Sequence, residues 1–401
     1  MTFTTFQLDK RIARGVQAAG FVDPTPIQSQ AIPVALEGKD ILGVAQTGTG
    51  KTAAFVLPIL QRLSQGPLHR VRCLILSPTR ELAQQIHEDF EQLGAHLRVR
   101  SLPIYGGVSK NRQIDQLASR PEIIVACPGR LLDHLGDGAI DLSQVEVLVL
   151  DEADRMCDMG FLPDVRRILR QLPRERQTLF FSATMPAEIR QLSQQMLRDP
   201  ITVQVGEIAP ARTVSHALYP ITKRRKRALL LTLLERTPTG RVLVFTRTKY
   251  GAKNLAQTLV KAGYRAVALQ GNMSQNRRLE AMNGFRGGKY DIMVATDVAA
   301  RGIDVSAISH VINFDMPDTA DAYTHRIGRT GRAEQTGEAW SFCTDDDRPT
   351  VRQVERRLDQ RIEVRRLDDF DYTAPPEPQT SRRPNTNRRR SRSSRQRTHR
   401  R

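Results

Sequence analysis

Short apolar runs alternate with longer amphipathic stretches between about residue 40 and residue 205. Near-continuous apolar runs between helices are typical of strands in a parallel sheet that is covered on both faces. Two stretches, Leu82–Leu93 and Val165–Leu172, repeat their apolar residues with the helical period and predict covering helices. The pattern predicts an α/β domain with strands at Asp40–Val44, Val71–Leu76, Ile123–Ala126, Val145–Leu150 and Thr178–Phe181.

The alternation stops after residue 205 and then begins again. The stretch Gly206–Arg212 is typical of a linker, and a second α/β domain is predicted from strands at Arg241–Phe245, Ala266–Leu269, Ile292–Ala295 and His310–Phe314. We therefore expect a first domain over residues 1–205, a linker over 206–215, a second domain over 216–368 and a tail over 369–401.

The two predicted domains resemble each other in the order of their segments. The first contains CLILSPTRELAQQI, then LPIYGG, then PEIIVACPGR. The second contains VLVFTRTKYGAKNLAQTL, then VALQGN, then YDIMVATDVAARG. Two copies of one α/β plan joined by a linker create a cleft, and such clefts are a preferred place for ligands.

Positive charge is concentrated at the end of the chain. Of the net charge of +18, the last 21 residues, Ser381–Arg401, contribute ten arginines and no acidic residue. The remaining residues hold 51 basic and 43 acidic side chains, a net charge of +8. The tail has no apolar face, so its charge favours a nucleic acid over a membrane as partner, with a purely solubilising role as the alternative. Its Arg, Ser and Asn content predicts disorder.

Several classes of protein are disfavoured by features that the sequence lacks. It has no apolar stretch near the ~20 residues that cross a bilayer, and MTFTTFQLDK does not resemble a signal peptide. The four cysteines lie far apart without a CxxC pair, which disfavours a disulfide framework and a zinc site. With 39% hydrophobic residues the chain can form packed cores, and we expect a cytoplasmic protein in a reducing compartment.

A glycine-rich loop follows the first predicted strand and leads into a helical pattern. Gly48 and Gly50 allow a tight turn whose backbone N–H groups face phosphate oxygens, and the helix start adds a positive dipole end. Lys51 can reach the β- and γ-phosphates and Thr52 can bind Mg²⁺. The nucleotide-binding loop is predicted to comprise Ala45, Gln46, Thr47, Gly48, Thr49, Gly50, Lys51 and Thr52, with Ala45 where the general pattern has Gly.

A second catalytic element follows the strand Val145–Leu150, which ends in Asp151-Glu-Ala-Asp154. Ligands bind at the carboxyl ends of strands in parallel sheets. Asp151 can hold Mg²⁺, most simply through water, and Glu152 can position and deprotonate the attacking water. A solvated acidic turn is the alternative, which the upstream Lys51 and Thr52 disfavour.

With these motifs in place, the sequence resembles a DEAD-box ATP-dependent RNA helicase of superfamily 2, from about Phe3 to Asp368. The resemblance implies two tandem RecA-like domains with parallel sheets, followed by a disordered basic tail. The segments DMGFLPDVRRIL and QTLFFSATMP are most similar to the bacterial RhlE-type branch. The resemblance rests on FVDPTPIQ, PTRELA, Gly106-Gly107, SAT at 182–184, Gln275 with Arg278, ATDVAARGID at 295–304 and HRIGRTGR at 325–332.

The resemblance assigns further residues to the nucleotide. Gln28 would read the adenine edge, and Phe3, seventeen positions before Gly20, would stack on adenine, with Phe21 also at this site. Gly302 and Asp304 would lie near the ribose and γ-phosphate. The implied cofactors are ATP and Mg²⁺, the latter at Thr52 and Asp151.

The segment His325–Arg332 has a solvated basic turn as its bland interpretation. Arginine forks pair with phosphate oxygens and stay charged, so they suit a second domain that senses nucleotide on the first. The resemblance assigns Arg329 and Arg332 to the γ-phosphate as arginine fingers. It assigns interdomain coupling to Ser182, Thr184 and His325.

The resemblance also implies that RNA crosses both domains on the face away from ATP. Contacts to phosphate and sugar carry no sequence information, so little sequence specificity is expected. Cys127 stands where the family usually has Thr, and a thiol is a weaker donor, which puts that contact in doubt. The implied RNA-binding residues are Thr79, Arg80, Gly107, Arg130, Arg247, Gln275, Arg278, Thr296 and Asp297.

We expect the chain to unwind short RNA duplexes, because ATP and RNA would close the two domains and hydrolysis would reopen them. Two alternatives are an RNA-binding or annealing protein with a vestigial ATPase, and a DNA-translocating helicase. The filled catalytic positions disfavour the first, and DEAD together with Gln28 disfavours the second. The physiological RNA stays open among ribosome assembly, mRNA decay and cold response, with RNA-degradation or ribosome-assembly proteins as partners.

Overall fold

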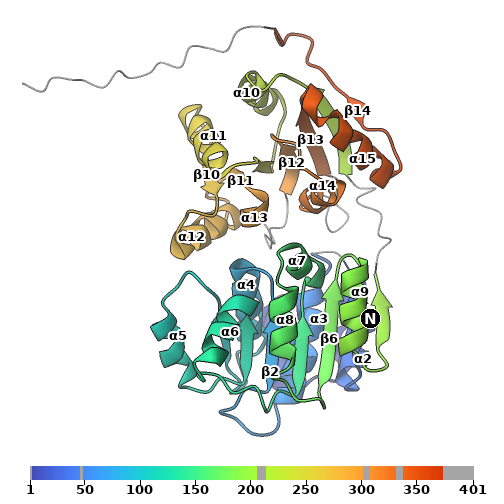
Figure 1. Ribbon diagram of the computed structural model, residues 1–401, viewed down its shortest axis with the longest axis vertical. Coiled ribbons are helices and arrows are strands. Elements are labelled where there is room, and N and C mark those ends of the chain that lie inside the picture. Colours follow the sequence, from blue (N-terminus) through green and yellow to red (C-terminus); the bar gives the residue numbers. More distant parts are fainter. Residues whose placement is uncertain (1, 46–47, 206–213, 301–307, 331–336, 374–401) are drawn as a thin grey trace, which may run out of the picture.

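The computed structural model describes residues 2–45, 48–205, 214–300, 308–330 and 337–373. They form two lobes, one above the other in Figure 1, each with a seven-stranded parallel sheet between helices. We call residues 2–205 the first lobe and 214–373 the second lobe. The predicted linker Gly206–Arg212 and the tail from residue 374 lie outside the described residues.

The first sheet has the strand order β3-β4-β2-β5-β6-β1-β7, and all its pairs are parallel. Consecutive residues of β6 face opposite sides, because Phe180 and Phe181 belong to different hydrophobic clusters. The strands are β1 (Ile41–Val44), β2 (Cys73–Leu76), β3 (Ser101–Ile104), β4 (Ile123–Ala126), β5 (Val147–Leu150), β6 (Gln177–Ser182) and β7 (Ile201–Gln204).

Helices cover both faces of this sheet and bury its apolar strands (Figure 1). They are the short η1 (Phe3–Phe6) and α1 (Lys10–Ala18), α2 (Pro26–Leu36), α3 (Lys51–Leu63), α4 (Arg80–Leu93), α5 (Lys110–Leu117), α6 (Pro128–Gly136), α7 (Ala153–Asp158), α8 (Leu162–Leu169) and α9 (Ala187–Met196).

The second sheet repeats the first with every strand number raised by seven. Its order is β10-β11-β9-β12-β13-β8-β14, again with parallel pairs. The internal resemblance predicted from the sequence is therefore a duplicated topology. The strands are β8 (Val214–Pro220), β9 (Arg241–Phe245), β10 (Ala266–Leu269), β11 (Ile292–Ala295), β12 (Ile308–Asn313), β13 (Gly337–Cys343) and β14 (Glu363–Val364).

The second lobe packs its helices around Trp340, Phe342 and Tyr323, which are at most 2% exposed. The described helices are α10 (Lys226–Arg236), α11 (Lys249–Lys261), α12 (Gln275–Arg286), α13 (Asp297–Ala300), α14 (Ala320–Ile327), η2 (Asp345–Asp347) and α15 (Arg348–Leu358). No helix among the described residues is long and apolar enough to span a bilayer.

The strands predicted at Ile123–Ala126, Arg241–Phe245, Ala266–Leu269 and Ile292–Ala295 have the observed bounds. The helix predicted at Val165–Leu172 lies instead at Leu162–Leu169, with Pro163 in its first turn. Pro173 follows, and a residue that precedes proline is disfavoured in helical conformation. That prediction was therefore wrong at both ends.

Candidate nucleotide and RNA sites

The glycine-rich loop joins β1 to α3, and Lys51 is the first residue of that helix. Gly50 has φ +91°, and a Cβ there would lie 2.6 Å from Gln28 Nε2, so glycine is required. Lys51 is 5% exposed, and its Nζ donates to the Ala45 carbonyl at 3.0 Å. The loop therefore offers a helix N-terminus and a buried cation, the arrangement that binds phosphate. Gln46 and Thr47 lie outside the described residues.

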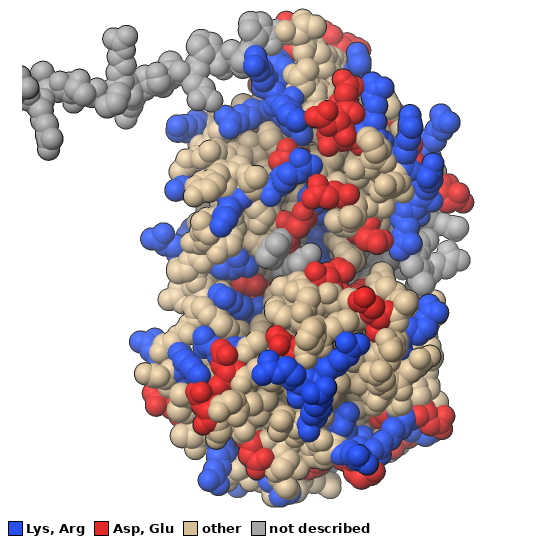
Figure 2. All heavy atoms as spheres, in the orientation of Figure 1, with Lys and Arg blue, Asp and Glu red and all other residues tan. Residues whose placement is uncertain are grey.

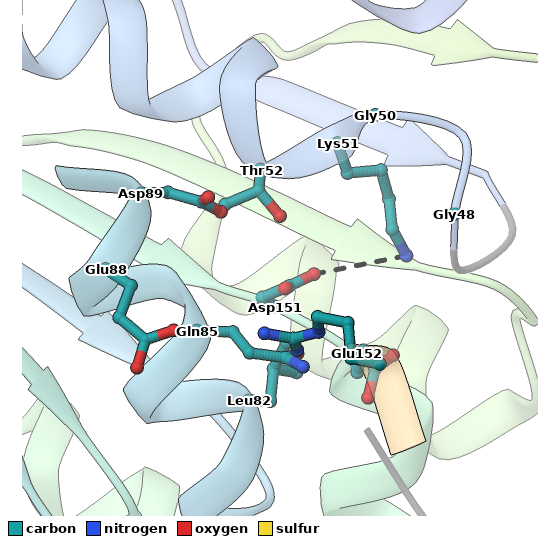
Figure 3. A pocket seen from close by; sticks show the side chains of 11 residues that line it. Gly48, Gly50, Lys51, Thr52, Leu82, Gln85, Glu88, Asp89, Asp151 and Glu152 are labelled. Atoms are coloured by element: carbon teal, nitrogen blue, oxygen red, sulfur yellow. Dashed lines mark ion pairs between the residues drawn. The ribbon is translucent and has the colours of Figure 1, made fainter. Parts of the chain in front are cut away.

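A pocket of about 330 Å³ opens beside this loop (Figure 3). Lys51, Thr52, Asp151 and Glu152 point into it, and Lys51 Nζ lies 4.0 Å from Asp151 Oδ1. Arg286 of the second lobe also lines the pocket, so both halves of the chain contribute to it. The other lining residues are Gly48, Gly50, Leu82, Gln85, Glu88 and Asp89.

Asp151 lies directly after β5 and is 2% exposed. Burial raises the pKa of its carboxyl, and Lys51 opposes this by lowering it. Its Oδ1 has no hydrogen-bond partner among the described residues. A carboxylate oxygen that accepts no hydrogen bond and lies beside a threonine hydroxyl fits a hard cation such as Mg²⁺. No group of three or more His, Cys, Asp or Glu in the described part of the chain could hold a metal alone.

Glu152 is held in an unusual backbone conformation at the start of α7. Its φ is +55°, and its side chain is 3% exposed. Arg155 Nη1 donates to Glu152 Oε2 at 2.6 Å, which directs the carboxylate. Arg155 was not among the residues predicted from the sequence, although its place three residues after Glu152 on a short helix allows an i, i+3 pair.

Asp154 links α7 to the end of β6. Its Oδ2 accepts hydrogen bonds from the Thr184 backbone N–H and from Thr184 Oγ1, both at 2.9 Å. Ser182 Oγ accepts from the Asp154 backbone N–H at 3.2 Å and donates to the Thr184 carbonyl at 2.7 Å. The structure thus joins Ser182 and Thr184 to the acidic segment.

The second lobe presents α14 to this acidic segment. Burial lowers the pKa of His325, the cation of Arg155 lowers it further, and Asp154 raises it. His325 therefore faces α7 of the first lobe across the interface. Arg329 is 3% exposed, and its positive charge also lowers the pKa of His325. Arg332, Gly302 and Asp304 lie outside the described residues.

Gln28 connects α2 to the glycine-rich loop. Its Nε2 donates to the Gly50 carbonyl at 3.1 Å, and its Oε1 accepts from the Thr25 backbone N–H at 2.9 Å. Phe3 is 8% exposed and packs 5.8 Å from Phe21, centroid to centroid. Phe21 is 39% exposed, so it is the more accessible of the two predicted aromatic rings.

The RNA-binding residues predicted in the first lobe form one cluster, with the exception of Thr79. Gly107 has φ +80°, and a Cβ there would overlap the Arg80 guanidinium. Arg130 Nη2 lies 4.0 Å from the Cβ position of the adjacent Gly106. The Thr79 side chain is buried and caps α4 by accepting from the Leu82 N–H at 3.2 Å.

Gln275 and Arg278 are not arranged as open RNA contacts. Both are buried, and both donate to Glu81 Oε1 of the first lobe, Arg278 Nε at 2.7 Å and Gln275 Nε2 at 3.2 Å. Their side chains join the two lobes where α12 lies against α4, and their role in RNA binding stays a prediction. Sequence reasoning missed Glu81, which stands inside the quoted PTRELA segment.

The remaining predicted contacts of the second lobe differ in accessibility. The Arg247 side chain is 54% exposed and lies 3.3 Å from Asp318. Arg326 holds both oxygens of Asp297, at 2.5 and 2.7 Å, and sequence reasoning missed this arginine. The backbone carbonyl of Thr296 accepts from Ala299 and Ala300 within the α13 turn.

Cys127 is the N-cap of α6 and makes no side-chain cap hydrogen bond. Burial raises the pKa of its thiol to about 12, so it stays protonated at neutral pH. The side chain thus behaves as a small apolar group where a hydroxyl was expected from the family pattern.

Family models and similar proteins both match this chain over most of its length. The family model for DEAD/DEAH box helicases matches residues 25–192, and that for the helicase conserved C-terminal domain matches residues 225–334. The chain is 42% identical over 364 residues to DEAD-box ATP-dependent RNA helicase CshA of Geobacillus kaustophilus, covering 90% of this chain and 78% of that protein. It is 41% identical over 367 residues to CshA of Bacillus subtilis, with 90% and 74% covered.

Solved structures match both lobes together. S. cerevisiae Dbp5 bound to RNA and ADP BeF3 superposes with a TM-score of 0.81 at 29% identity, over 90% of this chain and 95% of that one. Mss116p bound to ssRNA and AMP-PNP gives a TM-score of 0.81 at 26% identity, over 92% and 80%. A DEAD box protein from Methanococcus jannaschii is 34% identical over 91% and 99%, with a TM-score of 0.55. The arrangement of the lobes thus resembles that of the two RNA-bound proteins.

Proposed function

Because the chain belongs to the DEAD-box family of ATP-dependent RNA helicases, we propose that its RNA-stimulated ATPase uses Glu152 as general base and Lys51 as the main phosphate cation. The observation that carries this proposal is the pocket between the lobes, into which Lys51, Asp151 and Glu152 point. Glu152 would take the proton of the attacking water, and Arg155 would keep its carboxylate in place.

Mg²⁺ is proposed at Thr52 and Asp151, with ATP and water as its other ligands. The Asp151 oxygen that accepts no hydrogen bond supports this placement. When bound, Mg²⁺ would neutralise charge on the phosphates. Lys51 and the loop N–H groups would hold the phosphates. Gln28 would place the adenine next to the loop that it already contacts, with Phe3 and Phe21 beside it.

Closure of the lobes is proposed as the link between RNA and ATP. Arg329 and Arg332 would reach the γ-phosphate, while Gly302 and Asp304 would lie near the ribose and γ-phosphate. His325 would connect α14 to Asp154, which Thr184 and Ser182 already hold. Gln275 and Arg278 would stabilise closure through Glu81, rather than by contact with RNA.

RNA is proposed to cross the cluster of Arg80, Gly107 and Arg130 and then the exposed Arg247. Backbone groups of Thr79 and Thr296 would complete the path. The Thr79 side chain already caps α4, and the Thr296 carbonyl already accepts hydrogen bonds within the α13 turn. Asp297 would act indirectly, by holding Arg326. Such contacts to phosphate and sugar select little sequence.

The finer assignments rest on the sequence. The segments DMGFLPDVRRIL and QTLFFSATMP support the RhlE-type branch, whereas the relatives named above are CshA proteins. The ten arginines of the tail support an additional RNA contact. A cytoplasmic location and partners in RNA degradation or ribosome assembly are part of the same proposal.

The test compares ATP hydrolysis by the whole chain alone, with RNA, and with DNA of the same sequence. RNA should stimulate turnover more strongly than DNA, and a short RNA duplex should be separated only with ATP. Turnover that ignores RNA would support an RNA-annealing protein with a vestigial ATPase. Stronger stimulation by DNA would identify a DNA helicase instead.

A further inference from the structure

A groove on the second lobe lies outside the nucleotide pocket and is lined by cations. It measures about 1190 Å³ and runs between α11, the edge strand β10 and the loop before α12. We call it the α11 groove. Lys and Arg side chains predominate in Figure 2 on the flank where Figure 1 places α11 and α12. Four cations and no carboxylate line it, namely Lys249, Lys253, Lys261 and Arg277.

The charge of the α11 groove is not balanced by acidic neighbours. None of its four cations forms an ion pair within the described parts of the chain. The groove of about 1080 Å³ at the other side of the same lobe differs, because there Lys223 pairs with Asp346 at 2.9 Å and Arg348 with Asp345 at 2.7 Å. Unbalanced positive charge along a concave surface attracts a polyanion.

The shape of the groove suits an extended strand with unpaired bases. Lys249, Lys253 and Val260 share one face of α11, because they are spaced by four and seven residues. From Lys249 to Lys261 the helix rises roughly 18 Å. Tyr250 is 70% exposed and Val260 53%, so an aromatic and an aliphatic side chain of the groove are accessible to solvent. An exposed aromatic ring among cations is the arrangement on which single-stranded bases stack.

We propose that the α11 groove binds an unpaired RNA segment that continues from the main RNA path. Tyr250 stacks on a base, and Lys253, Lys261 and Arg277 contact phosphates. Continuity supports this occupant, since Arg247 of the proposed RNA path lies two residues before Lys249, the first residue that lines the groove. The inference rests on the proposed RNA path and extends it beyond the two-lobe cleft.

The test measures RNA affinity of the full chain with a non-hydrolysable ATP analogue, using single strands of about 5 and about 20 nucleotides, which bracket typical site sizes. Tyr250→Ala should weaken the binding of the long strand about 5- to 100-fold. Lys253→Glu with Lys261→Glu should lower the salt slope for the long strand by about 1.4, for two phosphate contacts. Neither variant should change binding of the short strand.

The matched control is Lys39→Glu with Lys289→Glu, which changes the net charge equally at two exposed lysines outside the groove. The proposal would be overturned if this control lost as much RNA affinity as the groove variants, or if the groove variants lost none. Equal loss of affinity for the short and the long strand would also overturn it. Competition by polyglutamate as strong as that by RNA would identify an acidic peptide site instead. If the short strand failed to stimulate the wild-type ATPase, the RNA path and the groove would both be wrong.

Discussion

Glu152 combines a left-handed backbone conformation, which is unfavourable for a residue with a Cβ, with a side chain that is anchored by Arg155. A left-handed φ costs a residue with a Cβ about 1–2 kcal/mol. The segment keeps this conformation because Arg155 holds Glu152 and because Thr184 holds Asp154. The acidic segment is therefore pre-formed, and its carboxylates need not reorganise when water attacks.

Glu152→Gln should abolish turnover while it preserves ATP binding. The amide cannot accept the proton of the attacking water, so kcat of the RNA-stimulated ATPase should fall about 10²- to 10⁴-fold. Isothermal titration with ATP and steady-state hydrolysis assays would separate the two quantities. The dissociation constant should stay within a few-fold of the wild-type value.

Glu175→Gln is the matched control, because this glutamate side chain is 92% exposed on the same lobe. It should hydrolyse ATP at the wild-type rate. Wild-type turnover in Glu152→Gln would mean that another group takes the proton.

Sequence reasoning finds residues whose spacing is local and misses those whose partner is distant. The loop at 45–52 and the segment at 151–154 are contiguous, so their chemistry can be read directly. The bond from Gln28 to Gly50 and the contact of Arg278 with Glu81 depend on how helices pack. No local pattern specifies those partners.

At the scale of elements, α4 and α12 meet through one buried charge pair. Arg278 and Glu81 have side chains 10% and 4% exposed, and they come from different lobes. A buried pair that loses one partner leaves an uncompensated charge. The pair thus favours the closed arrangement and disfavours partial opening.

A double-mutant cycle with Glu81→Gln and Arg278→Gln should reveal this coupling. Each single change should raise the RNA concentration needed for half-maximal ATPase stimulation by about 10-fold or more. The double change should cost less than the sum, with a coupling free energy of about 0.5–3 kcal/mol. Strict additivity would show that the two side chains act independently. Basal ATP binding serves as the internal control.

Two histidines in the second sheet make its stability sensitive to acid. His216 on β8 and His310 on β12 are 7% and 6% exposed, and burial lowers the pKa of each. Nearby Glu338 opposes this shift at His310. These histidines therefore bind protons more readily in the unfolded chain than in the folded one. Their contribution to stability is fully present above the ordinary histidine pKa and is lost as pH drops below it.

The free energy of unfolding should therefore fall between pH 7.5 and pH 5.5, by up to about 1.4 kcal/mol per pH unit for each histidine. Urea unfolding followed by the fluorescence of Trp340, the single tryptophan, reports on this sheet. His310→Gln should flatten the dependence, whereas His96→Gln at an exposed site should not. An unchanged slope in His310→Gln would contradict the prediction.

The strands were the most predictable elements. Four of them have the expected bounds, and β4 and β11 among these are buried at every residue, so that each is an uninterrupted apolar run. The helix at Leu162–Leu169 was less predictable, since its apolar period continues past the residue where it ends. The place of α12 against α4 could not be predicted from periodicity, which does not specify which helices pack together.

At the scale of the molecule, the concentrated positive charge of the tail is separate in sequence from the proposed catalytic residues. Deleting Ser381–Arg401 should weaken RNA binding about 10-fold or more at ~0.1 M salt and lower the salt slope by about 0.7 for each lost phosphate contact. Fluorescence anisotropy with labelled RNA at several salt concentrations measures both quantities.

ATP affinity without RNA should not change in the deletion, because the nucleotide pocket lies between the lobes. Replacing the ten tail arginines by lysine should retain most of the effect, since the contact is electrostatic. RNA affinity and salt slope equal to those of the full chain would leave the tail without a role in binding.

Because the seven-stranded sheet is repeated, one polypeptide supplies two similar lobes, as the two subunits of a dimer would. Its halves have diverged: β1 is followed by the glycine-rich loop, whereas Pro220 at the equivalent strand end of the second half leads into Thr222-Lys-Arg-Arg225. A tethered partner is present at a local concentration that the linker sets, not the solution. Specific activity should therefore be independent of dilution, and each chain should take up a single ATP.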